Sequence, residues 1–131
     1  MRTKDYDDDD FLCRCGRCAW SRTGQVGVVR PELMQAVQAV HDVYGGGVHV
    51  VSGRRCHNHN LELRGKSHGY HTSGMAADLV SGDLERLADA AEVVPEVSYI
   101  ELCDDHVHID IGRHRSSGRR VDARRVKGGV A

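Results

Sequence analysis

The chain has 131 residues, of which 28% are charged and 40% hydrophobic, a length that suits one domain with one modest core. Its apolar runs are only a few residues long, so we expect no transmembrane helix and no membrane insertion. The first ten residues lack the apolar segment of a signal peptide, so we expect a protein made in the cytoplasm.

The net charge of −1 is unevenly distributed along the chain. Residues 1–10 carry two basic and five acidic side chains, whereas residues 113–131 carry seven basic side chains and one acidic side chain. Charged ends of one sign are typical of solvated segments. We therefore predict an acidic N-terminal tail over 1–10, one domain over 11–112 and a flexible basic tail over 113–131. The basic tail favours weak attraction to polyanions, either nucleic acid or an anionic cell wall.

Hydrophobic periodicity predicts two helices. Residues 31–44 begin with Pro, repeat apolar side chains at steps of three and four, and end before three glycines. Residues 83–93 repeat Leu and Ala in the same way.

Short apolar or alternating segments predict four strands, at 48–52, 75–80, 97–103 and 106–111. Only two residues separate the last two, so they should form a tight antiparallel hairpin. Residues 53–74 are polar and irregular, which predicts a long loop. The order helix, strand, loop, strand, helix, hairpin predicts a small single α+β domain with an antiparallel sheet.

The final predicted strand has one apolar face and one polar face. Side chains alternate along a strand, so the polar face offers two imidazoles and a carboxylate, those of His106, His108 and Asp110. All three are ligand types that zinc accepts. The alternative is a polar face exposed to solvent.

His71 and Asp78 form a second candidate pair, because a loop that folds back at Gly74 would bring them together. A catalytic zinc site uses three protein ligands and leaves one position for water. His71, Asp78 and one histidine of the final strand would supply the three ligands. The spacing does not decide whether that histidine is His106 or His108. The alternative for Asp78 is a carboxylate satisfied by backbone donors.

A carboxylate near that water would serve as the general base. Asp105, at the mouth of the hairpin, and Asp110 are both candidates, and their spacing does not decide between them. Trp20 and Tyr70 are the aromatic residues that we expect nearest to a cleft.

These motifs, in their order along the chain, resemble the zinc D-alanyl-D-alanine carboxypeptidase family of peptidoglycan peptidases, which includes phage endolysins. The resemblance is carried by Phe11-Leu-Cys-Arg-Cys-Gly16, Ser52-Gly-Arg-Arg-Cys56, His59-Asn60, His71-x-x-Gly74-x-Ala76-x-Asp78 and Asp105-His-Val-His-Ile-Asp110. It implies a fold like that of the hedgehog domain and the DD-peptidases.

The resemblance also implies a site. A zinc cofactor would be held by His71, Asp78 and His108. Asp105 would be the catalytic acid/base, and His106 would help to stabilise the oxyanion or orient the site. Arg55 would be the cation that binds a substrate carboxylate or carbonyl oxygen.

The implied function is a zinc metallopeptidase that hydrolyses a D-Ala-containing bond in peptidoglycan peptide stems, as a D,D-carboxypeptidase or a D,D-endopeptidase. An L-Ala-D-Glu peptidase is the further activity that such a site would allow. The alternative is a non-catalytic zinc-binding module on the same scaffold. We expect a monomer, and no nucleic acid partner, because aromatic side chains do not interleave with the basic ones. Such an enzyme would reach the cell wall after release, as a phage or prophage lysin or a virion-associated enzyme does.

The five cysteines are an odd number, which favours metal binding or free thiols over disulfides. Three of them lie close together in the sequence, at Cys13, Cys15 and Cys18. A closed structural zinc site would take its fourth ligand from Cys56, His57 or His59. The alternatives are a disulfide between Cys56 and one of Cys13 and Cys15, and free thiols. Cys103 lies in a predicted strand, and we expect it to be buried and inert.

Overall fold

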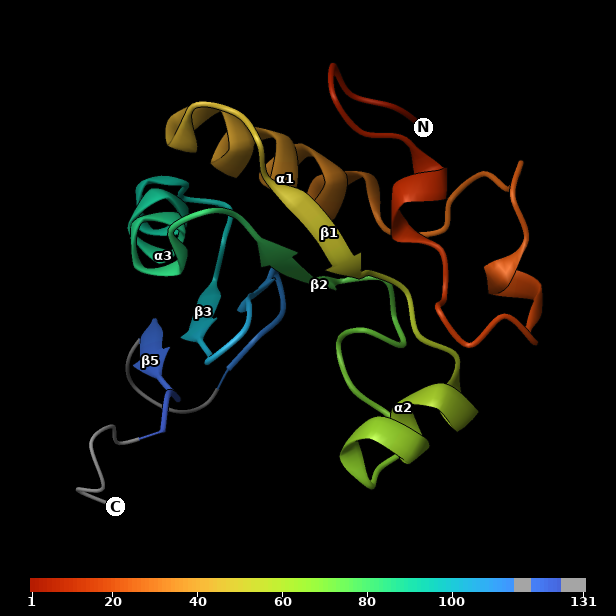
Figure 1. Ribbon diagram of the computed structural model, residues 1–131. Coiled ribbons are helices and arrows are strands. Elements are labelled where there is room, and N and C mark those ends of the chain that lie inside the picture. Colours follow the sequence, from red (N-terminus) through yellow and green to blue (C-terminus); the bar gives the residue numbers. More distant parts are fainter. Residues whose placement is uncertain (115–118, 126–131) are drawn as a thin grey trace.

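The computed structural model describes residues 1–114 and 119–125. This part of the chain contains three α-helices and a five-stranded sheet, and two short 3-10 helices, η1 (Asp8–Phe11) and η2 (Ala19–Ser21), lie near the N-terminus (Figure 1). None of these helices is both long enough and apolar enough to cross a membrane.

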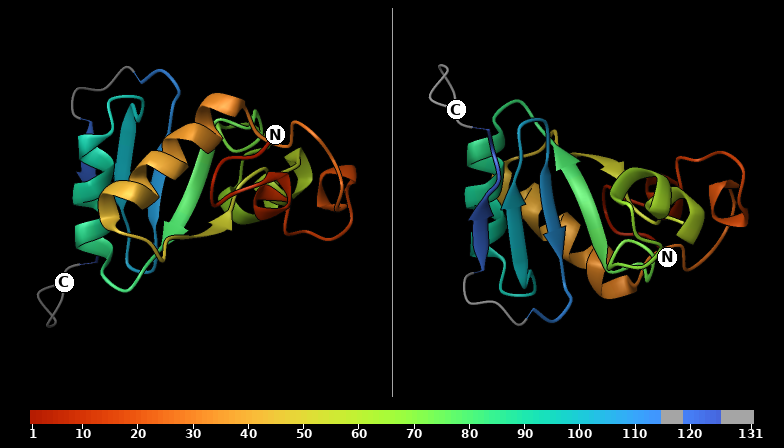
Figure 2. Two further views of the ribbon diagram at one scale, coloured as in Figure 1. Left: turned by 90° about the horizontal axis from the view of Figure 1, so that it is seen from above. Right: turned by 90° about the horizontal axis from the view of Figure 1, so that it is seen from below.

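The two predicted helices are confirmed. Helix α1 (Pro31–Tyr44) starts at proline and ends at Gly45, whose φ of 106° is a left-handed conformation that favours glycine. Helix α3 (Leu84–Val93) is capped by Asp83, whose side chain accepts a hydrogen bond from the Arg86 amide. Both helices cover the same face of the sheet (Figure 2).

The sheet has the order β1-β2-β4-β3-β5. Neighbouring strands are antiparallel except β3 and β5, which are parallel. The predicted hairpin is confirmed as the β3–β4 pair, and the α+β class is confirmed as well. The strands are β1 (His49–Ser52), β2 (Ala76–Val80), β3 (Tyr99–Leu102), β4 (Val107–Asp110) and β5 (Arg120–Asp122).

The sheet has one apolar face and one polar face. The apolar face packs against α1 and α3 and is built from Ala77, Leu79, Ile100, Leu102, Val107 and Ile109. The alternation along each strand turns the intervening side chains to the other face, where Asp78, Tyr99, Glu101, His108 and Asp110 lie. The core therefore holds the scaffold beneath a polar surface on which a site can form.

The expectation of a loop throughout 53–74 is wrong, because residues 57–64 form helix α2 (His57–Arg64). Its N-cap is Cys56, whose sulfur accepts a hydrogen bond from the His59 amide, and its only buried residue is Asn60. Since the helix has no apolar face, hydrophobic periodicity could not reveal it. Helix α2 lies beyond β1 and β2, apart from the other two helices (Figure 1).

Within the acidic segment 1–10, two side chains are packed rather than solvated. Tyr6 is buried, and its hydroxyl donates a hydrogen bond to the Val48 carbonyl oxygen. Asp8 is buried too, because the N-terminal amine and the amides of Gly27 and Val28 donate hydrogen bonds to its carboxylate. These donors compensate the negative charge of Asp8, which allows this side chain to be buried although its segment is acidic.

The predicted basic tail over 113–131 contains an element that its charge does not indicate. Strand β5 pairs with β3 at the edge of the sheet. The Arg120 guanidinium forms ion pairs with Asp89 and Glu92 of α3. Residues 115–118 and 126–131 lie outside the described residues, so the predicted flexibility of those segments stays a prediction.

Candidate metal centre

Three chain segments bring His71, Asp78 and His108 together on the polar face of the sheet. Asp78 in β2 and His108 in β4 are directly opposite each other in the antiparallel register, so their side chains lie on the same face. His71 lies in the turn before β2. Gly74, with a φ of 73°, allows that turn to fold back, and its carbonyl oxygen accepts a hydrogen bond from the Arg30 amide.

The potential ligand atoms of these three residues lie within 4.8 Å of one another. The Asp78 Oδ1 atom is 3.2 Å from His71 Nε2 and 3.1 Å from His108 Nδ1. Ligands about 2.1 Å from a tetrahedral zinc ion are separated by about 3.4 Å. A cation would therefore fit among these atoms after shifts of a few tenths of an ångström.

The protonation of His71 supports a cation at this point. Its Nδ1 lies 2.8 Å from the Gly53 carbonyl oxygen, an acceptor, so Nδ1 carries the proton. Burial lowers the pKa of His71, which leaves the ring neutral and Nε2 without hydrogen. This buried nitrogen has no hydrogen-bond partner and faces a carboxylate oxygen. Two electron-pair donors at this separation are compatible when a cation lies between them.

His108 is oriented by a carboxylate on its far side. Its Nε2 lies 2.7 Å from Asp110 Oδ2, which leaves Nδ1 directed at Asp78. Burial alone would lower the pKa of His108, but the hydrogen bonds with Asp110 and Asp78 raise it to about 9. Asp110 is only 1% exposed. A buried carboxylate behind a histidine is the usual support for a metal ligand, since it fixes the tautomer and the ring orientation.

Arg55 divides the two oxygens of Asp78 between different partners. Its Nη2 donates to Asp78 Oδ2 at 2.8 Å, which leaves Oδ1 for the two histidines. The guanidinium is itself held by Ser52 and by Asn60 of α2, and Arg55 is only 5% exposed. Burial acts to raise the pKa of Asp78, but the hydrogen bond with His108 outweighs it and holds that pKa well below its usual value. Asp78 is therefore an ionised carboxylate with a fixed direction.

A cavity of about 330 Å³ lies against these residues. His71, His108 and Arg55 are part of its lining, so two of the three candidate metal ligands face space that solvent or a ligand can occupy. We expected Tyr70 and Trp20 near a cleft. This is correct for Tyr70, which lines the cavity, and wrong for Trp20, which stacks against the Arg54 guanidinium. The other lining residues are Asn60, Arg64, Lys66, His68, Gly69, Tyr99, Glu101, Asp110 and His114.

Comparison with protein families agrees with this geometry. The family model of peptidase M15 matches residues 6–110. This chain belongs to the peptidase M15 family. The match includes all three candidate ligands and supports the resemblance to the zinc D-alanyl-D-alanine carboxypeptidases. The family consists of zinc metallopeptidases. A search of curated proteins finds no match.

Asp105 and His106 lie at the edge of this M15 site. The Asp105 side chain is 88% exposed and is not in the cavity lining, and its Oδ1 lies 2.7 Å from His106 Nδ1. That hydrogen bond lowers the pKa of the Asp105 carboxyl group, so the group is ionised at neutral pH. His106 Nε2 lies 3.8 Å from Asp78 Oδ1. Asp105 therefore reaches the ligand set through one imidazole.

The sequence interpretation missed Glu101 and Tyr99, which line the cavity. Their position could have been derived from the predicted hairpin. A two-residue connection places Glu101 opposite His108 and Tyr99 opposite Asp110, and these are the pairs that the register contains. The Tyr99 hydroxyl donates to Glu101 Oε2 at 3.0 Å, so the two act as a linked pair.

The cysteines separate into two groups. Cys13, Cys15, Cys18 and Cys56 gather at one place, whereas Cys103 is apart from them. Cys103 is half-buried rather than buried, and burial together with the Glu101 carboxylate raises the pKa of its thiol to about 12. All five thiols are free, and no disulfide forms among them.

Proposed function

We propose that this M15 peptidase is a zinc-dependent peptidoglycan peptidase that hydrolyses a D-Ala-containing bond in cell-wall peptide stems. The observation that carries the proposal is the facing arrangement of His71 Nε2 and Asp78 Oδ1, two buried acceptors 3.2 Å apart beside a cavity. A donor set of two imidazoles and one carboxylate suits zinc and leaves a coordination position for water.

In this proposal zinc, when bound, lowers the pKa of water and polarises the peptide carbonyl group. His71, Asp78 and His108 hold the ion. Arg55 fixes the direction of Asp78, and Asp110 fixes that of His108, through the hydrogen bonds described above. The positive charge of Arg55 also lines the cavity, where it favours negative charge on the carbonyl oxygen.

Asp105 acts as the general base and then as the general acid. Its ionised carboxylate takes a proton as water attacks and returns that proton to the leaving amine. His106 links this carboxylate to the ligand set, and so orients it and stabilises the oxyanion. Because Glu101 lines the cavity, it is the competing carboxylate for the same role.

The rim of the cavity indicates how the substrate binds. Arg64, Lys66 and His68 all line it, and all three are exposed. A volume of about 330 Å³ suits the end of a short peptide. Exposed cations there would bind a terminal carboxylate, which favours a D,D-carboxypeptidase over the two peptidases that cut within a peptide.

The test is hydrolysis of defined pentapeptide stems ending in D-Ala-D-Ala, followed by mass spectrometry, with and without a chelator and with zinc added back. We expect release of one D-Ala, lost with chelator and restored by zinc. Asp105→Ala should keep zinc and lose turnover, whereas Glu101→Gln should stay active. The opposite result for these variants would assign the base to Glu101. Zinc binding without cleavage of any stem would indicate the non-catalytic module instead.

A further inference from the structure

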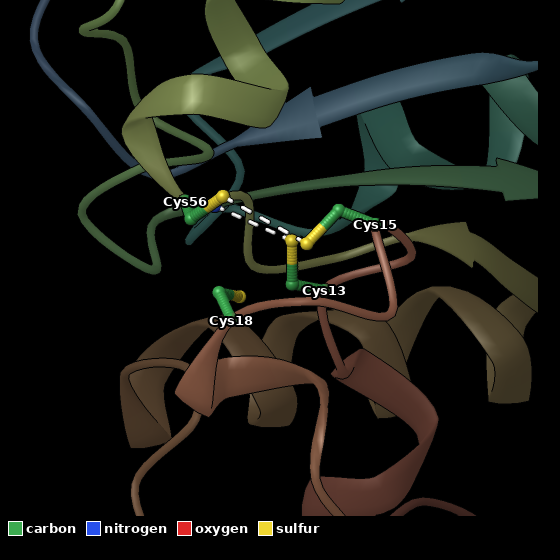
Figure 3. A group of neighbouring side chains, drawn as sticks. All are labelled: Cys13, Cys15, Cys18 and Cys56. Atoms are coloured by element: carbon green, nitrogen blue, oxygen red, sulfur yellow. Dashed lines mark hydrogen bonds between the residues drawn. The ribbon is translucent and has the colours of Figure 1, made fainter.

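The strongest feature outside the M15 site is the group of four cysteines. Cys13, Cys15 and Cys18 belong to the segment between η1 and η2, and Cys56 comes from the start of α2 (Figure 3). Their sulfur atoms all lie within 4.8 Å of one another, although Cys56 is more than 35 residues away in the sequence. The tertiary structure thus brings Cys56 to three thiols that lie far from it in the sequence.

We propose that Cys13, Cys15, Cys18 and Cys56 bind a second zinc ion, which has a structural role. Four sulfur atoms about 2.3 Å from a tetrahedral zinc ion are separated by about 3.8 Å. The Sγ atoms of Cys15 and Cys56 are 3.9 Å apart. Sulfur atoms joined in a disulfide would be about 2.05 Å apart, so the spacing fits a shared ion rather than a covalent bond.

The backbone around the cluster provides the donors that thiolate ligands need. The amide of Cys56 donates to Cys13 Sγ, the amide of Arg17 to Cys15 Sγ, and the amide of His59 to Cys56 Sγ, at 3.3–3.4 Å. Ser21 Oγ lies 3.5 Å from the sulfur atoms of Cys15 and Cys18. The three amide contacts stabilise negative sulfur and fix its direction, as the outer shell of a metal site does, whereas the Ser21 hydroxyl donates to the Cys13 carbonyl oxygen at 2.7 Å.

The histidines considered as alternative fourth ligands are not part of the cluster. The His57 Nδ1 atom lies 2.6 Å from the Ser67 carbonyl oxygen, and the nearest carboxylate to His59 Nδ1 is that of Glu62, at 3.6 Å. The four cysteines therefore form a complete set. A tetrathiolate site is closed, with no position for water, which is characteristic of structural rather than catalytic zinc.

This second ion would position the M15 site through residues 53–56. Cys56 follows Arg55 directly, and Arg55 holds Asp78. The Arg54 amide donates to the Phe11 carbonyl oxygen at 2.9 Å, two residues before Cys13. The Gly53 carbonyl oxygen faces His71 Nδ1. Joining Cys56 to the N-terminal cysteines thus anchors the segment that orients two of the three candidate catalytic ligands.

The experiment measures metal content and cobalt spectra of the full chain. We expect two zinc ions per wild-type chain and one in Cys18→Ser. Cys103→Ser is the matched control, since it removes the one cysteine outside the cluster and should keep two ions. With cobalt in place of zinc, the wild-type protein should show the intense thiolate-to-cobalt charge-transfer absorption of a tetrahedral thiolate site, and Cys18→Ser should lose most of it.

The His71→Ala variant separates this proposal from the proposed function. It should lose the catalytic ion and keep the thiolate-to-cobalt absorption. Absence of that absorption in the wild-type protein would overturn the proposal, as would an intact mass that shows a disulfide in the freshly purified protein. An equal loss of metal in Cys103→Ser would also overturn it. If Cys18→Ser does not fold, the wild-type spectrum and mass still decide the question.

Discussion

The role assigned to Asp110 makes a quantitative prediction. Asp110 is 1% exposed, and its Oδ2 lies 2.7 Å from His108 Nε2. Its other oxygen accepts hydrogen bonds from the Gly112 amide and from His114. In Asp110→Asn, the single amide oxygen can accept hydrogen bonds either on the His108 side or on the side of Gly112 and His114. The amide nitrogen then faces a donor on the other side.

The expected loss follows from this conflict. Removing the support of a metal ligand weakens metal binding about 10- to 100-fold. At about 1.4 kcal/mol per tenfold change, this is about 1.4–2.8 kcal/mol. Leaving one buried donor unsatisfied costs about 1–3 kcal/mol, which is of the same size. We therefore expect zinc to bind about 10- to 100-fold more weakly to Asp110→Asn than to the wild-type protein.

The assay is competition for zinc against a chromophoric chelator, with circular dichroism to check the fold. Asp89→Asn is the matched control, because it removes the same charge from the exposed surface of α3, where Asp89 pairs with Arg120. Its zinc affinity should equal that of the wild type. If Asp110→Asn also binds zinc at wild-type affinity while His71→Ala does not, then Asp110 does not orient His108.

Three further variants test stability, zinc binding and substrate binding. Tyr6→Phe removes the buried hydrogen bond to Val48 and should lower the free energy of unfolding by about 1 kcal/mol. Burial raises the pKa of Tyr6 in the folded state. The free energy of unfolding of the wild type should therefore fall as pH rises above about 10, the pKa of tyrosine in the unfolded chain. In urea titrations, Tyr6→Phe should show a smaller fall. Gly53→Ala should destabilise by about 1–3 kcal/mol and weaken zinc binding, because its Cβ would lie 2.8 Å from Phe11. The Arg64→Ala/Lys66→Ala double variant should raise KM for a D-Ala-D-Ala peptide about tenfold with little change in kcat, as expected when uniform binding is lost.

The Gly53→Ala variant and the Arg64→Ala/Lys66→Ala variant each have a matched control. Gly82→Ala should be neutral in stability and in zinc affinity, because a Cβ there meets nothing within 4 Å. Arg22→Ala removes an exposed cation outside the cavity lining and should leave KM unchanged. A wild-type KM in the Arg64→Ala/Lys66→Ala variant would refute carboxylate binding at the rim. An identical fall in stability at high pH for the wild type and Tyr6→Phe would refute the pH argument.

Local patterns in the sequence were sufficient to predict the main helices and strands of the scaffold. Proline at the start and glycine at the end mark the helix over 31–44, and the two-residue connection after Cys103 implies the β3–β4 hairpin. The alternation along β4 also separates core from polar residues, because strand geometry repeats every second residue. The same register could have placed Glu101 opposite His108.

Elements without an apolar pattern could not be derived in this way. Helix α2 is polar, and only its Asn60 is buried. The acidic N-terminal segment packs because donors distant in sequence surround Asp8. Strand β5 depends on pairing with β3 and on ion pairs to α3. In each case the stabilising partner is remote, and the segment alone carries no sign of it.

The sequence by itself determined the α+β class, the two amphipathic helices, the hairpin and the kinds of side chain available for metal chemistry. Only the tertiary structure decided that His71 Nε2 has no hydrogen-bond partner, that Arg55 takes one oxygen of Asp78 and leaves the other to the two histidines, and that Cys56 joins three cysteines from the N-terminal segment. The physical reason is that periodicity reports which face of an element is buried, whereas the direction of a polar side chain depends on donors and acceptors contributed by distant parts of the chain.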